Sequence, residues 1–252
     1  MIYRLAHAEL LRWSRRPSSW FMLATVLFLL SVLFLIFLQS FSEHIQPANL
    51  NSDHPLGLGD AVILPYLWWS GLILLSIMPM LSMRLVSEER QRQTWSLLAS
   101  APIKPLHIIL GKFFGLSLQV SLLIFLVALF PISLVFGAAI DVTRLVSGLF
   151  GLWLLLASFG AAGLYCSTLT DDPIVAALTA YGLLLLMGLL YFGSNTPGAA
   201  SETFNYLAHF GHFPAWLEGR FNSAHLAYFL LFSGLFLWLA VRRIQYEHLR
   251  NH

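Results

Sequence analysis

Six stretches of this chain are each long and apolar enough to cross a lipid bilayer, and they limit its fold more than any other feature. A helix needs about 20 apolar residues to span the hydrocarbon core. Backbone polar groups in lipid must pair within the chain, and helices satisfy that requirement. The stretches are residues 19–38, 61–83, 106–136, 145–167, 174–192 and 224–241. We predict an all-α integral membrane protein with six transmembrane helices, forming one domain over residues 1–252.

The composition agrees with a surface that is covered by a lipid bilayer. Hydrophobic residues make up 58% of the 252 and charged residues only 10%, whereas soluble domains carry roughly 25% charged residues. The net charge of +2 is too small to indicate a nucleic-acid partner. A polar-rich segment precedes the first apolar stretch and no small-residue cleavage site follows it, so we expect a retained helix rather than a signal peptide.

The basic residues are distributed unevenly among the loops, and cytoplasmic loops are the ones enriched in Lys and Arg. Of the 14 Lys and Arg residues, all but two fall on one side of the membrane. They are Arg4, Arg12, Arg15 and Arg16 before the first span, Arg84, Arg90, Arg92, Lys104 and Lys112 between the second and third, and Arg242, Arg243 and Arg250 after the last. Only Arg144 and Arg220 lie on the other side. Both termini are therefore expected in the cytoplasm.

The middle of each predicted span lacks Asp, Glu, Lys and Arg. Ionisable groups at that depth usually mark proton relays, ion sites or catalytic pairs. Their absence argues against a proton- or sodium-coupled carrier acting alone, and against a carboxylate-based intramembrane enzyme. Lys112 lies about 9 Å inside the third stretch, at 1.5 Å per residue. We expect its flexible stem to carry the amine out to the lipid headgroups.

The string Gly57-Leu58-Gly59-Asp60 matches the GxGD motif of intramembrane aspartyl proteases. That chemistry needs two carboxylates close enough to share a proton, and no span supplies a partner for Asp60. We favour a capping role for Asp60 at the start of the second span.

Three histidines and a glutamate lie near one another on the outer side, and together they could hold a metal ion. They are His209, His212, Glu218 and His225. The many aromatic residues among them are instead typical of a segment at the membrane interface, so we expect no metal. No HExxH, GxSxG or Walker A sequence occurs, so this chain is not expected to hydrolyse ATP.

The loop at residues 84–104, between the second and third spans, carries a helical pattern. Ser87 can cap a helix, and Glu88 and Glu89 add negative charge in its first turn, where the helix dipole favours it. An apolar stripe follows at helical spacing, formed by Thr94, Leu97, Leu98 and Ala101. Pro102 ends the helix. Such a helix suits the transmission of movement from a soluble partner and equally suits an interfacial helix on lipid; the pattern alone does not choose.

Residues 1–16 form a second amphipathic pattern, with arginines on one side and apolar residues on the rest. We predict a helix that lies in the inner interface and feeds the first span after a bend at Pro17. Within the spans, three pairs of small residues at i, i+4 spacing predict close approach of helices. These pairs are Gly111 and Gly115, Ser147 and Gly151, and Ala157 and Ala161.

Four segments, in order along the chain, carry further motifs. They are Ala8-Glu9-Leu10 with Arg16-Pro17-Ser18-Ser19-Trp20; Pro79 through Arg90 with Leu97-Leu98-Ala99-Ser100-Ala101-Pro102 and Leu110-Gly111-Lys112-Phe113; Gly163 through Thr170 with Ile174-Val175-Ala176-Ala177; and Leu207-Ala208-His209-Phe210 through Gly219 to Tyr228-Phe229-Leu230. Together they resemble the ABC-2 permeases of the gliding-motility-associated type over almost the whole chain. Where that family shows Gly-Thr-Leu-Glu, this chain departs, with Gln93-Thr94-Trp95-Ser96.

The resemblance implies a permease subunit of an ATP-driven exporter in a prokaryotic inner membrane. It implies two copies of a separate subunit that binds ATP and Mg, a second permease copy or a related permease, and no cofactor on this chain. The loop helix would be the coupling helix that docks on the ATP-binding subunit. The residues expected to do so are Glu88, Glu89, Arg90, Thr94, Leu97, Leu98 and Pro102. Residues 194–222 would form short helices that cap the outer side of the pathway.

Two other functions stay open on the residues alone. A non-transporting membrane anchor or scaffold would use the same loop to hold a partner, regardless of nucleotide. A metal-dependent membrane enzyme would use His209, His212 and His225, and would lose a stoichiometric metal when His209 and His212 are replaced. A largely apolar pathway fits lipids, hydrophobic peptides and amphipathic drugs equally well.

Overall fold

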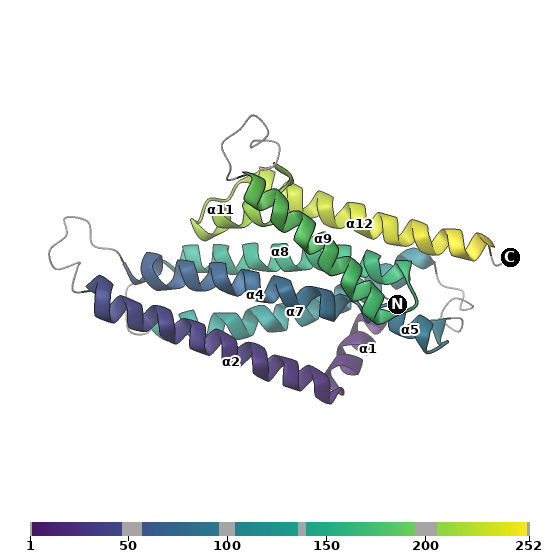
Figure 1. The fold of residues 1–252 in the computed structure, drawn as a ribbon, viewed down its shortest axis with the longest axis horizontal. Coiled ribbons are helices and arrows are strands. Elements are labelled where there is room, and N and C mark those ends of the chain that lie inside the picture. Colours follow the sequence, from purple (N-terminus) through teal and green to yellow (C-terminus); the bar gives the residue numbers. More distant parts are fainter. Residues whose placement is uncertain (1, 47–56, 96–103, 136–139, 195–205, 251–252) are drawn as a thin grey trace.

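A computed structural model describes most of the chain, and its described residues are folded almost entirely into helices (Figure 1). The described residues are 2–46, 57–95, 104–135, 140–194 and 206–250. Six helices among them are long and apolar enough to cross a membrane. They are Pro17–Ile45, Gly59–Gln91, Pro105–Leu134, Val142–Leu169, Pro173–Ser194 and Ser223–Glu247. The predicted all-α fold with six spans is confirmed.

The helical elements follow the chain in a simple order. They are α1 (Ile2–Ser14), α2 (Pro17–Ser40) with the π-helical extension η1 (Phe41–Ile45), η2 (Gly59–Ile63), α4 (Leu64–Ser82), α5 (Ser87–Gln91), α7 (Pro105–Val135), α8 (Val142–Leu169), α9 (Pro173–Ser194), η3 (His209–His212), α11 (Phe213–Leu217) and α12 (Ser223–Arg250). Helix α12 continues nine residues past the predicted end of the sixth span at Val241, which brings its last turns beside α5.

Helix α8 lies at the centre of the bundle, in contact with α4, α7, α9, α11 and α12 (Figure 1). Its most apolar segment is 78% buried, whereas those of α9 and α12 are 11% and 17% buried. Glycines permit this central position because the neighbours come closer than a Cβ would allow. A Cβ on Gly151 would lie 2.4 Å from Cβ of Trp216, and one on Gly163 only 2.0 Å from Oγ of Ser82.

Pro131 lies inside α7, and a residue of α4 compensates for its missing N–H. Without that donor, the carbonyl of Val127 one turn earlier loses its helical partner. The buried hydroxyl of Tyr66 donates to this carbonyl over 3.2 Å. In lipid, where water cannot replace a lost hydrogen bond, such a bond between helices satisfies the freed group.

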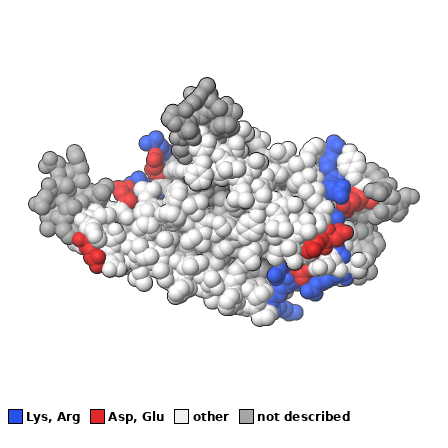
Figure 2. Space-filling view, viewed as in Figure 1, with Lys and Arg blue, Asp and Glu red and all other residues white. Residues whose placement is uncertain are grey.

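Charged side chains gather at the two ends of the long axis, with a broad uncharged band between them (Figure 2). The end that holds α1, α5 and the end of α12 carries most of the charge visible in this view. At the opposite end, Arg144 pairs with Asp60 across 2.8 Å. The capping role predicted for Asp60 is wrong, because Asp60 lies within η2, where its side chain caps no N–H group of the helix, and its carboxylate binds Arg144 of α8 instead.

The tight contact at Gly163 predicts a measurable loss of stability. Gly163→Ala should lower the free energy of unfolding by about 1–3 kcal/mol, because the new methyl group overlaps Ser82 and forces α4 away from α8. Gly182→Ala in α9 is the matched control, since nothing lies within 4 Å of its Cβ position. Thermal unfolding of the detergent-solubilised variants measures both. Equal melting temperatures for the two variants would contradict the packing described.

Candidate functional site

Helix α1 is packed against the beginning of α7 and is more than an interfacial helix resting on lipid. Ala6 of α1 is 3% exposed. A Cβ on Gly115 of α7 would lie 2.8 Å from Cβ of Glu9, so Gly115, the second member of the predicted small-residue pair, lies against α1. This contact places the carboxylate of Glu9 against a charged residue about two turns into α7.

That residue is Lys112, and it is the centre of a buried ion-pair cluster. Its ammonium group lies 2.9 Å from Glu9 and 2.8 Å from Glu89. It donates hydrogen bonds to Glu9 and to the carbonyl of Leu85. With a side chain 2% exposed, Lys112 does not reach the headgroups. The predicted escape to the interface is wrong, because two carboxylates from other helices neutralise the amine in place.

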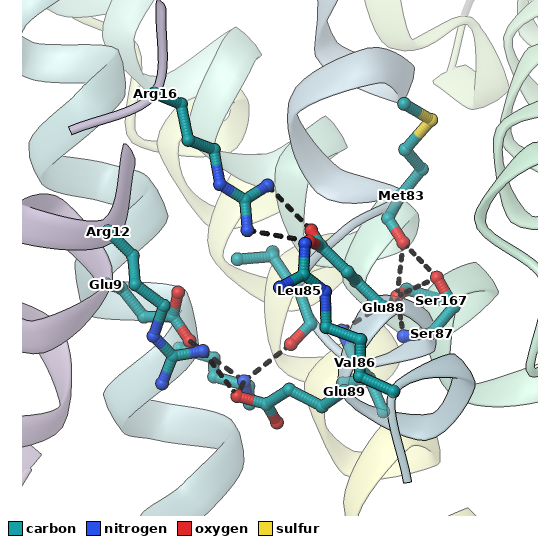
Figure 3. A network of polar contacts seen from close by, with 12 residues as sticks. Glu9, Arg12, Arg16, Met83, Leu85, Val86, Ser87, Glu88, Glu89 and Ser167 are labelled. Carbon is teal, nitrogen blue, oxygen red and sulfur yellow. Dashed lines mark hydrogen bonds and ion pairs between the residues drawn. The ribbon is translucent and has the colours of Figure 1, made fainter. Parts of the chain in front are cut away.

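Two arginines extend the cluster from the N-terminal helix to α5 (Figure 3). Arg12 lies 2.7 Å from Glu89, and Arg16 binds both oxygens of Glu88 at 2.7 Å. Two parallel charge-assisted bonds of this kind are among the strongest polar contacts in proteins. Burial alone would lower the pKa of Arg12, but its hydrogen bond to Glu89 and the nearby carboxylates raise it above the ordinary value. Arg16 directly precedes Pro17, so Glu88 ties α5 to the start of α2.

Arg90 makes the connection on the other side of α5. Its guanidinium lies 3.3 Å from Asp171, in the turn between α8 and α9, and also pairs with Glu247 near the end of α12. The Arg90 side chain is only 9% exposed and also lies over the ring of Trp95. Helix α5 is thus held by charged contacts to elements from both ends of the sequence.

The start of α5 is capped from another helix. The predicted cap by Ser87 is wrong, since Ser87 is the first residue inside the helix and its hydroxyl donates to the carbonyl of Met83. Instead, Oγ of Ser167 in α8 accepts from the N–H groups of Val86 and Ser87, each over 3.0 Å, and donates to Met83 (Figure 3). One hydroxyl thereby satisfies three backbone groups that the end of α4 and the start of α5 leave open.

Helix α5 is shorter than the predicted loop helix. It ends at Gln91, and Gln93 has φ +60°, a left-handed conformation that stops a helix. The predicted stripe therefore does not continue α5 as one uninterrupted helix. Exposed Thr94 donates to the carbonyl of Glu89, while Leu97, Leu98, Ala101 and Pro102 lie outside the described residues.

The structure brings together three of the predicted coupling residues, Glu88, Glu89 and Arg90, but turns their side chains toward partners in the same chain. Sequence reasoning missed Glu9 and Lys112 as members of this cluster, and Ser167 as the residue that caps α5. A lysine inside an apolar stretch was the available signal, because a charge there needs either an exit to water or an opposite charge.

The outer histidines do not gather as the metal hypothesis requires. His212 and His225 are in contact, with 2.7 Å between their Nδ1 atoms. Glu218 pairs with Arg220, and His209 points toward Ser158 and the Leu155 carbonyl. Among the described residues, no group of three or more potential ligands could hold a metal ion.

The segment that carries these histidines packs into the bundle instead of lying at its outer surface. His209 reaches Ser158, which lies about 24 Å along α8 at 1.5 Å per residue. Phe213 is 0% and Trp216 2% exposed, and Ser147 donates to the Trp216 carbonyl. Burial lowers the pKa of His212, against the opposing effect of its bond to the Tyr206 carbonyl, and the charge of nearby His225 lowers it further. Several side chains of the segment are therefore buried within the chain, while its position at the membrane interface stays a prediction.

Six apolar helices and a broad uncharged band between charged ends define a multi-pass membrane protein, and a short helix is tied by ion pairs to several of its helices at one end. Residues 5–170 match the family model described as ABC-2 family transporter protein. The match covers more than half of the chain, and the chain therefore belongs to that family. It is an ABC transporter permease, the membrane component of a transporter whose ATP-binding subunit is a separate partner. No curated protein matches the chain.

The cluster around Lys112 makes a prediction about stability. Lys112→Met should lower the free energy of unfolding by up to roughly 3–5 kcal/mol, because the buried Glu9 and Glu89 would keep only Arg12 as a shared cation and the Leu85 carbonyl would lose its donor. The control Lys104→Met removes an exposed lysine that makes no ion pair with the described residues, and should change it by less than about 0.5 kcal/mol. Thermal unfolding in detergent measures both variants. A Lys112→Met protein as stable as the control would mean that the amine leaves the cluster for the headgroups.

Proposed function

We propose that this chain is the permease subunit of an ATP-driven exporter of the gliding-motility-associated type. Its pathway is opened by a separate subunit that binds ATP and Mg. Membership of the ABC-2 family supports this proposal, as does the lack of a Walker A sequence in the chain. The basic residues at the end with α1 and α5 support a cytoplasmic position for both termini, in a prokaryotic inner membrane.

The observation that carries the coupling mechanism is the attachment of α5. This one short helix is bonded through Glu88 to the start of α2, through Glu89 to α1 and α7, and through Arg90 to α12. A partner that pushes on the loop after α5 would therefore pull on several membrane helices at once. In this mechanism Glu88, Glu89 and Arg90 position the loop.

Contact with the ATP-binding subunit is assigned to the part of the loop that follows α5. Thr94 is exposed at the beginning of that part. Leu97, Leu98 and Pro102 follow it as the proposed docking residues, and the apolar spacing of the two leucines suits a groove on the partner. Glu88 and Glu89 are less suited to direct docking, because their carboxylates are 14% and 12% exposed and are already paired.

A second permease copy or a related permease would complete the pathway. The apolar segments of α2 and α9 are only 22% and 11% buried within this chain. Large apolar side chains such as Phe28 and Leu189 are exposed on them. We propose that α2, α4 and α9 line a pathway between two permeases, each served by one ATP-binding subunit, with the η3–α11 segment closing the outer side.

The docking assignment predicts how a partner is retained. Leu97→Asp should lower, by at least tenfold, the amount of ATP-binding subunit that co-purifies. An unpaired carboxylate in an apolar groove costs more than ~1.4 kcal/mol, which is the free energy of a tenfold change in affinity. Tyr246→Asp is the matched control, an exposed aromatic at the same end of the bundle. The measurement is affinity purification in mild detergent with an ATPase assay of the eluate.

Three results would count against the proposal. Purification of the unaltered chain without any ATPase would favour the membrane scaffold. A partner held equally by the Leu97→Asp variant and the control would remove the loop from the interface. A partner whose ATPase activity is the same with and without this chain would argue against coupling.

A further inference from the structure

A large cavity lies beside the ion-pair cluster, between α1, α2, α4 and α7. Its volume is about 910 Å³. One part is apolar, lined by Met22, Val26, Leu29, Ile77, Met80 and Leu81. The cavity also reaches the outer surface of the bundle, because the lining residues Phe21, Leu29 and Met80 are 77%, 43% and 48% exposed. It is therefore open sideways, at the surface of the bundle beside α2 and α4.

The charged part of the lining has an excess of positive charge. Four arginines and three glutamates contribute to it: Arg12, Arg16, Arg84, Arg92, Glu9, Glu88 and Glu89. Arg84 is exposed and makes no hydrogen bond or ion pair with the described residues. Arg92 is 68% exposed and shares Glu88 with Arg16. Two guanidinium groups at the mouth are thus available to an anion.

Deeper in the cavity lies a polar side chain that makes no hydrogen bond with the described residues. Gln119 of α7 lines the cavity, is 3% exposed and makes no hydrogen bond there. It lies seven residues after Lys112, about 10 Å further along the helix. The Gln119 amide is not among the fully buried atoms that lack a partner, so it stays accessible from the cavity. It can therefore pair with a polar group of the occupant, at a greater depth than the arginines.

We propose that this cavity binds an anionic phospholipid of the cytoplasmic leaflet. Its phosphate lies at Arg84 and Arg92, its ester carbonyls lie near Gln119, and an acyl chain follows α2 and α4. The cavity wall from Ser18 to Leu29 of α2 is about 16 Å long, which suits an acyl chain and is far longer than a free phosphate needs. The inference goes beyond the transport function and uses only the membrane orientation proposed above.

The occupant lies where it can act on coupling. Arg16 and Glu88 both line the cavity and bind each other, so the lipid rests on the pair that ties α5 to α2. A second copy of α2, the other apolar occupant of suitable length, would bury Arg84 and Arg92 without supplying an anion. Charge complementarity therefore favours the phospholipid.

Binding to the purified full-length chain tests the proposal without the ATP-binding subunit. Native mass spectrometry follows titration with phosphatidylglycerol, with phosphatidylcholine of the same chains, and with glycerol 3-phosphate. We expect one phosphatidylglycerol per chain, held at least about tenfold more tightly than phosphatidylcholine, and no retention of glycerol 3-phosphate. Arg84→Gln with Arg92→Gln should weaken binding about 25-fold, since each arginine near an anionic lipid contributes about fivefold.

Two matched controls separate the cavity from general effects. Arg15→Gln with Arg242→Gln removes two exposed arginines that lie outside the cavity lining, and should leave binding unchanged. Leu29→Trp fills the apolar part and should weaken phosphatidylglycerol binding with every arginine intact. Leu35→Trp, on α2 but outside the lining and 61% exposed, should have no such effect.

Several results would overturn the proposal. Equal binding of the two phospholipids, or an equal loss in both arginine pairs, would reduce the lipid to nonspecific surface coverage. Retention of glycerol 3-phosphate with the affinity of the full lipid would leave only an anion site. Displacement of the lipid on formation of a permease dimer, with Arg84 and Arg92 buried in it, would assign the cavity to a second copy.

Discussion

The buried ammonium of Lys112 determines how the charged end of this protein is built. A cation held at 2% exposure needs opposite charge nearby, and the chain supplies it from two directions, through Glu9 of α1 and Glu89 of α5. The same requirement fixes α1 against α7, where Gly115 leaves room for Glu9. It also holds α5 below the end of α4, where the Leu85 carbonyl completes the cluster.

Much of this fold could be predicted from hydropathy, because length and apolarity alone decide whether a helix can cross a bilayer. The burial of Lys112 could not be predicted in this way. Its amine stays buried only because two carboxylates fold against it, and these come from Glu9 and Glu89, which lie 103 and 23 residues earlier in the chain. Helix α5 ends at Gln91 because Gln93 has a left-handed backbone conformation. This chain has no glycine at that position to indicate such a conformation. The cap from Ser167 is equally a product of tertiary contact.

Mechanically, the protein divides into a rigid centre and attached peripheral helices. Helix α8 is buried along most of its length and packs through glycines that admit no added methyl group. Helix α2 has much less contact and lies beside a large cavity. The ion pair between Arg16 and Glu88 lies beside this cavity, and its side chains are only 30% and 14% exposed. It can carry force from α5 to α2 without disturbing the core. The proposed lipid would occupy the space that such a movement changes.

In the proposed mechanism, the pair of Arg16 and Glu88 connects the ATP-binding partner to α2. The most direct measurement is the labelling rate of a reporter, Phe21→Cys, in a Cys166→Ser background, for the complex with and without a nonhydrolysable ATP analogue. We predict a nucleotide-dependent change in rate that Arg16→Glu abolishes and that Arg16→Glu with Glu88→Arg restores. An Arg16→Glu complex that keeps the partner and the full nucleotide response would contradict the account.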